Sequence, residues 1–194
     1  MILSDREIEN ALSQCLIFID PLPDKQQYTT SALDLRFGNE LYELTTIEEL
    51  DSQEPRGAHR PLIIDLANVS TAELFHKYAK PINAEKDGTF ILQPNKFVLG
   101  LTLEKVYLPE KSKLAARVEG RSTLARLGLV VHFTAPTIHC GFSGRIALEM
   151  YNFGCYPLIL TPGSLPICQL IFERLGSRPK RKIRTQYQHQ KDIR

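Results

Sequence analysis

The stretch VEGRSTLARLGLVVHFTAPTIHCGFSGRIALEMYN, residues 118–152, decides the fold and the candidate chemistry of this chain. It sets arginines, hydroxyls, histidines and carboxylates among apolar residues in the pattern of β-strands. Glu149 lies within the apolar run 146–150. An ionised carboxylate in apolar surroundings is costly unless it pairs with a cation or its pKa rises. Glu149 is therefore a candidate general acid or base, and a structural salt bridge between neighbouring strands is the open alternative.

Short strand-like runs recur on both sides of this stretch, separated by Pro, Gly, Asn or Asp. The predicted strands cover residues 33–37, 90–92, 97–103, 115–118, 129–133, 145–151, 158–160 and 167–172. Short strands at this density favour an all-β sandwich or barrel with minor helices.

Helical signals are few. Ser4 precedes residues 5–14 with Glu7 three positions on, which is the spacing of a capping box. Ser70 begins a second predicted helix over 71–78, which we expect Pro81 to end. Residues 121–126 predict a short helical turn that aims backbone N–H groups and two hydroxyls at an anion.

Length and composition favour one domain over residues 1–194. Hydrophobic residues at 43% and charged residues at 24% are ordinary for a globular chain and exclude disordered and fibrous classes. The polar, weakly periodic region 45–86 is interpreted as an insertion over the core without chemistry of its own. The apolar runs are far shorter than the roughly 20 residues that span a bilayer, and the charged N-terminus is unlike a signal peptide, so we expect a cytoplasmic protein.

The four cysteines, at positions 15, 140, 155 and 168, lack the short paired spacing of zinc sites. The H-x-E and P-C-x-x-C motifs of zinc-dependent nucleobase deaminases are also missing from the sequence. If this chain deaminates a base, it has to activate water with side chains and without zinc.

Positive charge gathers at the C-terminus. Residues 174–194 contain eight Lys or Arg and one acidic residue, a net +7, so residues 1–173 carry −5. A basic tail, taken as 175–194, suits nucleic acid, an anionic membrane or a phosphorylated small molecule, and a merely solvated tail is equally open. We favour a segment that closes over the phosphates of a nucleotide.

A resemblance to a known family extends along nearly the whole chain in the family's order. It begins at residues 1–8 (MILSDREI) and 31–38 (SALDLRFG), and is densest at 120–129 (GRSTLARLGL), 132–135 (HFTA), 141–144 (GFSG) and 148–149 (LE). It returns at 162–163 (PG), 169–172 (QLIF), Tyr187 and Gln190. The sequence resembles the dCTP deaminases of the trimeric dUTPase superfamily.

The resemblance implies the distorted jelly roll of the dUTPase superfamily, a dUTPase-like β-barrel or sandwich. It implies a homotrimer whose active sites are built from neighbouring chains. The implied activity is a hydrolase reaction of pyrimidine deoxyribonucleotide metabolism: deamination of dCTP to dUTP and ammonia, with Mg²⁺ acting only through the triphosphate and no metal held by the protein. Whether dTTP inhibits, as in some relatives, is left open.

The resemblance also implies roles for particular residues. Glu149 would be the general base and acid, Ser122 would hold the water, and Arg126 would orient this network. Phosphate and base contacts would come from Arg121, Thr123, Ala135, Ala147, Leu148, Gln186, Tyr187 and Gln190. For His132, in the loop expected over the base and sugar, a packed structural histidine is the favoured interpretation.

Two positions depart from the family pattern. His139 stands where an aspartate usually contacts the sugar 3′-hydroxyl, and in dUTPases that aspartate also activates water. A histidine cannot supply a fixed negative charge near pH 7, so His139 argues against phosphoanhydride hydrolysis. Gln186 replaces a phosphate-binding lysine, for which Lys182, Arg184 or Lys191 could substitute.

Three alternatives to a dCTP deaminase stay open. One is a dUTPase-type diphosphohydrolase or a bifunctional deaminase and diphosphatase. The second is a nucleotide-binding regulator without turnover, against which the combination of Ser122, Arg126 and Glu149 argues. The third and least favoured is nucleic-acid binding through the basic tail, which predicts a steep dependence of affinity on salt.

Overall fold

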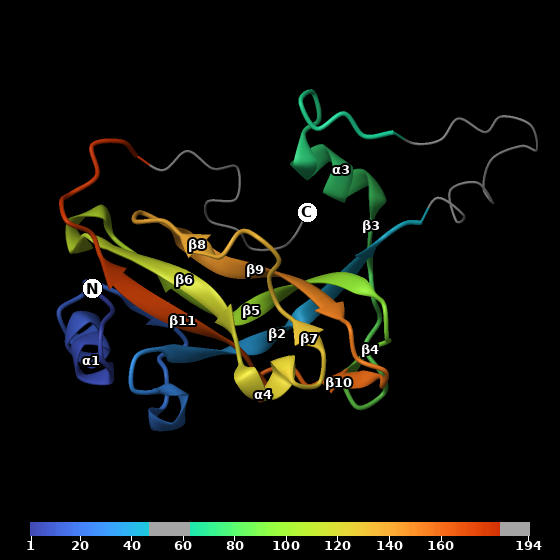
Figure 1. The fold of residues 1–194 in the computed structure, drawn as a ribbon, viewed down its shortest axis with the longest axis horizontal. Helices are drawn as coiled ribbons and strands as arrows, with labels where there is room; N and C mark the ends of the chain where they lie inside the picture. The colour runs from blue at the N-terminus through green and yellow to red at the C-terminus, as the bar shows by residue number, and fades with distance from the viewer. Residues whose placement is uncertain (47–62, 183–194) are drawn as a thin grey trace, which may run out of the picture.

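The computed structural model describes residues 1–46 and 63–182, and these residues form a mostly β structure (Figure 1). The predicted β-rich fold with minor helices is therefore confirmed. The strands are β1 (Phe18–Asp20), β2 (Leu33–Leu44), β3 (Ala79–Pro81), β4 (Phe90–Leu92), β5 (Phe97–Tyr107), β6 (Leu114–Gly120), β7 (Leu129–Val130), β8 (Thr137–Ile138), β9 (Ser143–Asn152), β10 (Leu158–Leu160) and β11 (Pro166–Arg174).

Nine of these strands form one sheet with the order β7-β9-β5-β2-β11-β6-β8, in which β1 pairs with β5 and β3 with β2. The small sheet pairs β10 with β4. The two strands at the ends of the main order, β7 and β8, are joined by residues 131–136 alone, which reach about 25 Å at full extension. Six strand spacings in a flat sheet would cover about 29 Å. The sheet therefore has to curl so that its two edges approach each other, as the ribbon in Figure 1 shows.

All eight predicted strands are present, and their ends differ from the prediction. β2 continues through Asn39 and Glu40 to Leu44, because Asn39 is exposed, Glu40 is only half-buried, and the pairing with β5 resumes at Leu41. β7 ends at Val130, and the chain leaves the sheet before His132. The short strands β1, β3 and β8 were not predicted; unlike the equally short β4 and β10, they are not runs of large apolar residues.

The predicted helices are confirmed, with a correction at one end. α1 (Asp5–Ser13) has the capping box, in which Ser4 and Glu7 exchange hydrogen bonds. α3 (Thr71–Tyr78) begins after Ser70, whose side chain accepts from the backbone N–H of Glu73. Pro81 does not end this helix; the chain turns at Ala79 into β3, which pairs with the far end of β2. Part of the region interpreted as an insertion thus joins the main sheet, and its residues 47–62 lie outside the described structure.

Three shorter helical segments complete the structure: η1 (Lys25–Gln27), η2 (Glu110–Ser112) and α4 (Ser122–Ala125). Most of the buried apolar residues form one hydrophobic core, which α1 joins through Ile8 and Ala11. Figure 1 shows α1 and α3 at opposite ends of the molecule.

A chain of buried polar groups crosses the sheet where its pairing is irregular. Register shifts interrupt the β2–β5 pairing between Phe37 and Leu41 and the β5–β9 pairing between Leu101 and Lys105. Thr102 fills this gap: its hydroxyl accepts from the N–H of Ile146 and donates to the carbonyl of Glu104.

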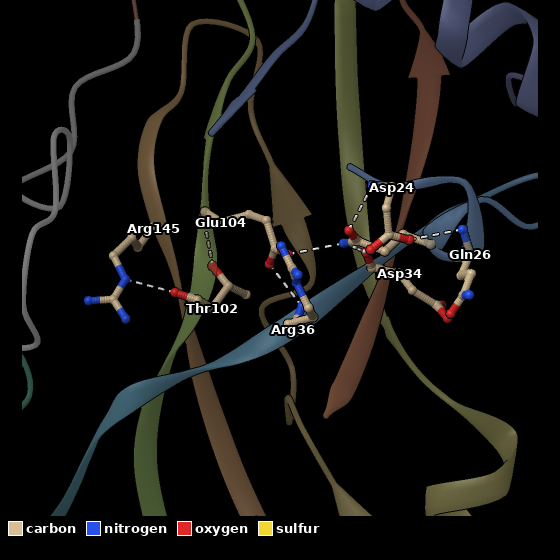
Figure 2. A network of polar contacts seen from close by, with 8 residues as sticks. Asp24, Gln26, Asp34, Arg36, Thr102, Glu104 and Arg145 are labelled. Atoms are coloured by element: carbon tan, nitrogen blue, oxygen red, sulfur yellow. Dashed lines mark hydrogen bonds and ion pairs between the residues drawn. The ribbon is translucent and has the colours of Figure 1, made fainter. Parts of the chain in front are cut away.

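The side chain of Glu104 is fully buried and accepts from Arg36 Nε at 2.7 Å, from the Arg36 N–H at 2.8 Å and from Gln27 Nε2 at 3.0 Å. Figure 2 shows this group and the neighbouring Arg145, whose Nε donates to the carbonyl of Thr102. Burying a charge is tolerated because its hydrogen bonds are satisfied.

Candidate active site

Glu149 lies on β9, opposite Leu99 of β5, with its side chain partly exposed. Its Oε2 accepts a hydrogen bond from the backbone N–H of Phe133 at 3.2 Å. Among the ion pairs of residues 1–46 and 63–182, none involves Glu149. The alternative of a salt bridge between neighbouring strands therefore has no support among these residues, and the described partner of the carboxylate is a backbone donor.

A cavity of about 400 Å³ opens beside Glu149. Ala147, His132 and Ala135 lie on its wall with Glu149. The rest of the wall is mostly apolar and is formed by Thr71, Phe75, Phe97, Leu99, Val118, Ile138, Phe142 and Ile146. A carboxylate in such a cavity is partly shielded from water, which strengthens its interaction with a bound polar group.

Ala147 and Glu149 of β9 lie on the cavity wall, and Leu148 between them does not line it. Ala147 is exposed, whereas Leu148 is fully buried in the core cluster. The side chain of Leu148 therefore cannot touch a ligand in the cavity, and only its backbone is available for the predicted contact.

α4 holds four of the predicted site residues near the outside of the molecule. Arg121 is its N-cap and Arg126 its C-cap, with Ser122 and Thr123 in the first turn. Ser122, Thr123 and Arg126 are exposed, and none of them lines the cavity at Glu149. The structure thus brings together Glu149, Ala135 and Ala147, and leaves the hydroxyls and Arg126 of α4 outside that group.

The position of α4 depends on a close backbone contact. Gly128, which follows the helix with φ +90°, lies so near Gly154 that a Cβ on Gly128 would collide with the Gly154 backbone. A Cβ on Gly154 would meet the carbonyl oxygen of Leu127. The N–H of Phe153 also donates to the carbonyl of Gly128 at 2.8 Å. The absence of a side chain at both glycines therefore allows the end of α4 to lie against the backbone that follows β9.

Arg121 is anchored from inside the protein. Its Nη2 lies 3.2 Å from Oδ2 of Asp34, and its Nη1 donates to the carbonyl of Pro166 at 3.3 Å. Asp34 is only 4% exposed on β2. Burial raises the pKa of Asp34 above its ordinary value, and the charge of Arg121 opposes that rise.

The two histidines of the central stretch differ in setting. His132 lines the cavity, with Nε2 at 3.8 Å from Oε2 of Glu119 and with Nδ1 buried and without a hydrogen-bond partner among the described residues. His139 follows β8, is exposed and does not line the cavity. Its neighbour Cys140 is buried, with Sγ near the carbonyls of Pro109 and Glu110, and burial raises the pKa of its thiol. A Cys–His nucleophile at this position has no support.

Three of the predicted site residues, Gln186, Tyr187 and Gln190, lie outside the described residues. Within residues 1–46 and 63–182, no group of three or more His, Cys, Asp or Glu side chains is placed to hold a metal ion. No helix in that part of the chain is long and apolar enough to cross a membrane.

The sequence reasoning missed two contributors to the site. α3 supplies Thr71 and Phe75 to the cavity wall, a contribution not expected of a region that was interpreted as an insertion without chemistry of its own. The second contributor is Asp34, whose buried carboxylate forms an ion pair with Arg121. The signal that identified Glu149, a carboxylate in an apolar strand, is also present at Asp34 between Leu33 and Leu35, whereas nothing local to α3 indicates where it packs.

These features define a class: a β-rich protein with a curled sheet, a carboxylate on the wall of an apolar cavity and an arginine-bearing turn displaced from it. The family model described as dCTP deaminase-like matches residues 2–175. The chain belongs to this dCTP deaminase-like family.

Individual relatives agree with that membership. A protein of Methanothermobacter thermautotrophicus named "dCTP deaminase, dUMP-forming" is 40% identical over 183 residues, covering 93% of this chain and 82% of the relative. One of Dictyoglomus thermophilum with the same name is 39% identical, covering 98% and 91%. A "dCTP deaminase" of Rhodospirillum rubrum is 36% identical, covering 91% and 84%.

Among solved structures, the 2′-deoxycytidine 5′-triphosphate deaminase of Agrobacterium tumefaciens superimposes with a TM-score of 0.63 over 88% of this chain. The identity is 19%, so this likeness concerns the fold. The present chain spans about half of that solved chain, 47% of its length.

Proposed function

We propose that this protein catalyses the hydrolytic deamination of dCTP, in which water replaces the C4 amino group of cytosine and ammonia leaves. The observation that carries the proposal is Glu149, a carboxylate held by a backbone N–H on the wall of a mostly apolar cavity, in a chain of the dCTP deaminase-like family. The names of the relatives described above support it.

In the proposed reaction, Glu149 takes a proton from the attacking water and delivers protons to the ring and to the departing ammonia. A positioned group of this kind contributes about 10²–10⁴ in rate. The N–H of Phe133 fixes one carboxylate oxygen, which leaves the other for water. The backbone of Ala147 and Leu148 reads the edge of the cytosine, since main-chain donors and acceptors can separate an amino group from a carbonyl.

Ser122 and Arg126 enter this scheme from a second copy of the chain. Their exposure in one protomer and their separation from its cavity support a homotrimer in which α4 of one protomer completes the cavity of its neighbour. Ser122 would hold the water, and Arg126 would balance the charge of Glu149 through a planar fork of donors. Arg121 and Thr123 would bind phosphate oxygens together with the tail residues Gln186, Tyr187 and Gln190.

The substrate is proposed to be the magnesium complex of dCTP. A Mg²⁺ ion bridging phosphates keeps several waters and needs few protein ligands. In this scheme the cation shields the triphosphate and takes no part at C4.

A second candidate is deamination followed by cleavage to dUMP and pyrophosphate. It is favoured by the names of the relatives from Methanothermobacter thermautotrophicus and Dictyoglomus thermophilum, which are called dUMP-forming. His139 argues against it, because an exposed imidazole, which cannot supply a fixed negative charge, replaces the carboxylate.

The deciding experiment incubates the purified protein separately with dCTP and with dUTP in Mg²⁺ and follows nucleotides by ion-pair chromatography, with assays for ammonia and pyrophosphate. We expect dCTP to give dUTP and ammonia in equal amounts. Pyrophosphate and dUMP from either nucleotide would establish the second candidate. No product from dCTP would contradict the proposal and favour a nucleotide-binding regulator.

A further inference from the structure

The ion pair between Asp34 and Arg121 joins the inside of the sheet to the turn that carries the predicted phosphate contacts. Asp34 lies on β2 and Arg121 at the N-cap of α4, and their side chains meet at 3.2 Å. The side chain of Arg121 is 30% exposed, so its guanidinium reaches the surface while its inner side is held.

Two nitrogens of this guanidinium are fixed from inside the protein. Nη2 faces Asp34 and Nη1 faces the carbonyl of Pro166. A guanidinium has five N–H donors in a planar fork, so donors remain for an anion arriving from solvent. An arginine anchored in this way presents them in one orientation.

Asp34 is itself held firmly. Its backbone carbonyl accepts from Gln27 Nε2, which also donates to Glu104, and Glu104 pairs with Arg36. Figure 2 shows Asp34 next to this buried group. The backbone at Asp34 is therefore held within the sheet, and its buried carboxylate meets the guanidinium of Arg121 from the inner side.

A carboxylate at this position is expensive for the fold. The neighbours Leu33 and Leu35 are fully buried, and apolar residues of similar volume often replace a buried ion pair without loss of stability. Its cost is explained if the pair serves Arg121.

We propose that Asp34 is a positioning residue, which orders the Arg121 guanidinium for the phosphates of the nucleotide; the inference rests on the proposed function. A free arginine side chain loses considerable rotamer freedom when it binds, and Asp34 removes most of that loss in advance. The negative charge of Asp34 opposes phosphate binding, but Arg121 lies between the two anions and screens them.

The test compares Asp34→Asn with Glu40→Gln. Glu40 lies further along the same strand and pairs with Arg145 of β9 at 2.6 Å, so Glu40→Gln breaks another carboxylate–arginine pair of β2 without touching Arg121. For each variant, KM and kcat for dCTP are measured, together with the dissociation constants of dCTP and of deoxycytidine, which has no phosphate.

We expect Asp34→Asn to weaken dCTP binding about tenfold, with kcat changed less than twofold and deoxycytidine binding unchanged. Glu40→Gln should leave the ratio of the two dissociation constants as in the wild type. In the double variant Asp34→Asn/Arg121→Gln, the loss should equal that of Arg121→Gln alone, because both changes remove one interaction.

Equal loss for dCTP and deoxycytidine, tighter dCTP binding, or the same ratio change in Glu40→Gln would overturn the inference. If Asp34→Asn does not fold, Asp34→Glu is used instead, because it keeps the charge and shifts its position. The inference would also be overturned if both Asp34→Glu and Arg121→Gln left the ratio of the dCTP and deoxycytidine dissociation constants unchanged. The dissociation constants test the inference separately from turnover, so a wild type that binds dCTP without releasing ammonia would contradict only the proposed function.

Discussion

At the scale of single residues, the backbone hydrogen bond that holds the Glu149 side chain in place does not depend on the ability of that side chain to exchange a proton. The N–H of Phe133 donates to Oε2, and this bond needs only an acceptor oxygen, which an amide side chain also supplies. The shape of the site can therefore survive a change that removes the proton shuttle.

Glu149→Gln should lower kcat for dCTP by about a hundredfold or more while dCTP affinity stays within about tenfold, because the glutamine retains the size of the side chain and cannot exchange the proton. Steady-state kinetics and calorimetric titration measure the two quantities. The matched control is Glu173→Gln, which alters a carboxylate of β11 that pairs with Arg117 of β6 and does not line the cavity; it should leave kcat unchanged. Unchanged turnover in Glu149→Gln would remove this residue from the mechanism.

How far the sequence predicts single residues depends on whether their surroundings are local. Glu149 stands out because its apolar neighbours are adjacent in the chain. The backbone donor from Phe133 could not be predicted, since it depends on how residues 131–136 cross between the two edges of the sheet. The exposure of His139 was also unpredictable, because alternation along a strand says nothing once the strand ends at Ile138.

At the scale of elements, the end of α4 is fixed by two glycines rather than by side-chain packing. Sequence patterns located the turn, but the contact between Gly128 and Gly154 joins residues 26 positions apart and has no local signal. The predicted strands and both longer helices were confirmed because each rests on a periodic or capping pattern within itself.

Gly128→Ala should displace α4, because the added Cβ collides with the Gly154 backbone and the residue would keep a positive φ. We expect a loss of stability of about 1–3 kcal/mol in urea unfolding from the strained φ alone, and a lower kcat because Ser122 and Arg126 move. Gly88→Ala is the control: it has φ +81° with no atom near the new Cβ, so it carries the strain without the collision. Equal effects of the two changes on kcat would refute this role of the glycine contact.

The stability contributed by the contact between α1 and β11 should depend on pH. Hydrogen bonds from the Ser4 backbone and from Arg174 lower the pKa of Glu7 below its ordinary 4.5. A carboxyl group with a lowered pKa in the folded state stabilises the protein above pH 4.5, and this contribution is lost as the pH falls through the folded-state pKa. Glu7→Gln should therefore lower Tm at pH 7 and have little effect near pH 3.

Thermal unfolding of Glu7→Gln at the two pH values measures this difference. Glu9→Gln, on an exposed position of the same helix, is the control and should shift Tm little at either pH. A Tm decrease of the same size at pH 3 and pH 7 would show that the carboxylate charge of Glu7 is irrelevant.

At the scale of the whole molecule, the proposed site needs a second chain, because α4 lies apart from the cavity. The resemblance to the family predicts a trimer, and Ser122 and Arg126 do not line the cavity of their own protomer. Assembly is thus the level at which the proposed site becomes complete.

Mixed trimers test this arrangement. Glu149→Gln and Arg126→Gln should each be inactive alone, and equal mixtures exchanged through denaturant should regain about one quarter of wild-type activity, because one site in four combines an intact Glu149 with an intact neighbouring Arg126. Separately treated, unmixed samples are the control. Activity no greater than the unmixed background would place both residues of each site in one chain.

The central place of β11 also has a consequence for how the chain reaches this structure. β11 lies between β2 and β6 in the sheet, although its residues follow those of β2 by more than 120 positions. Such non-local pairing slows folding, because a long loop has to close before the contacts form. During synthesis, the edges of β2 and β6 that face β11 therefore stay unpaired until Arg174 has left the ribosome.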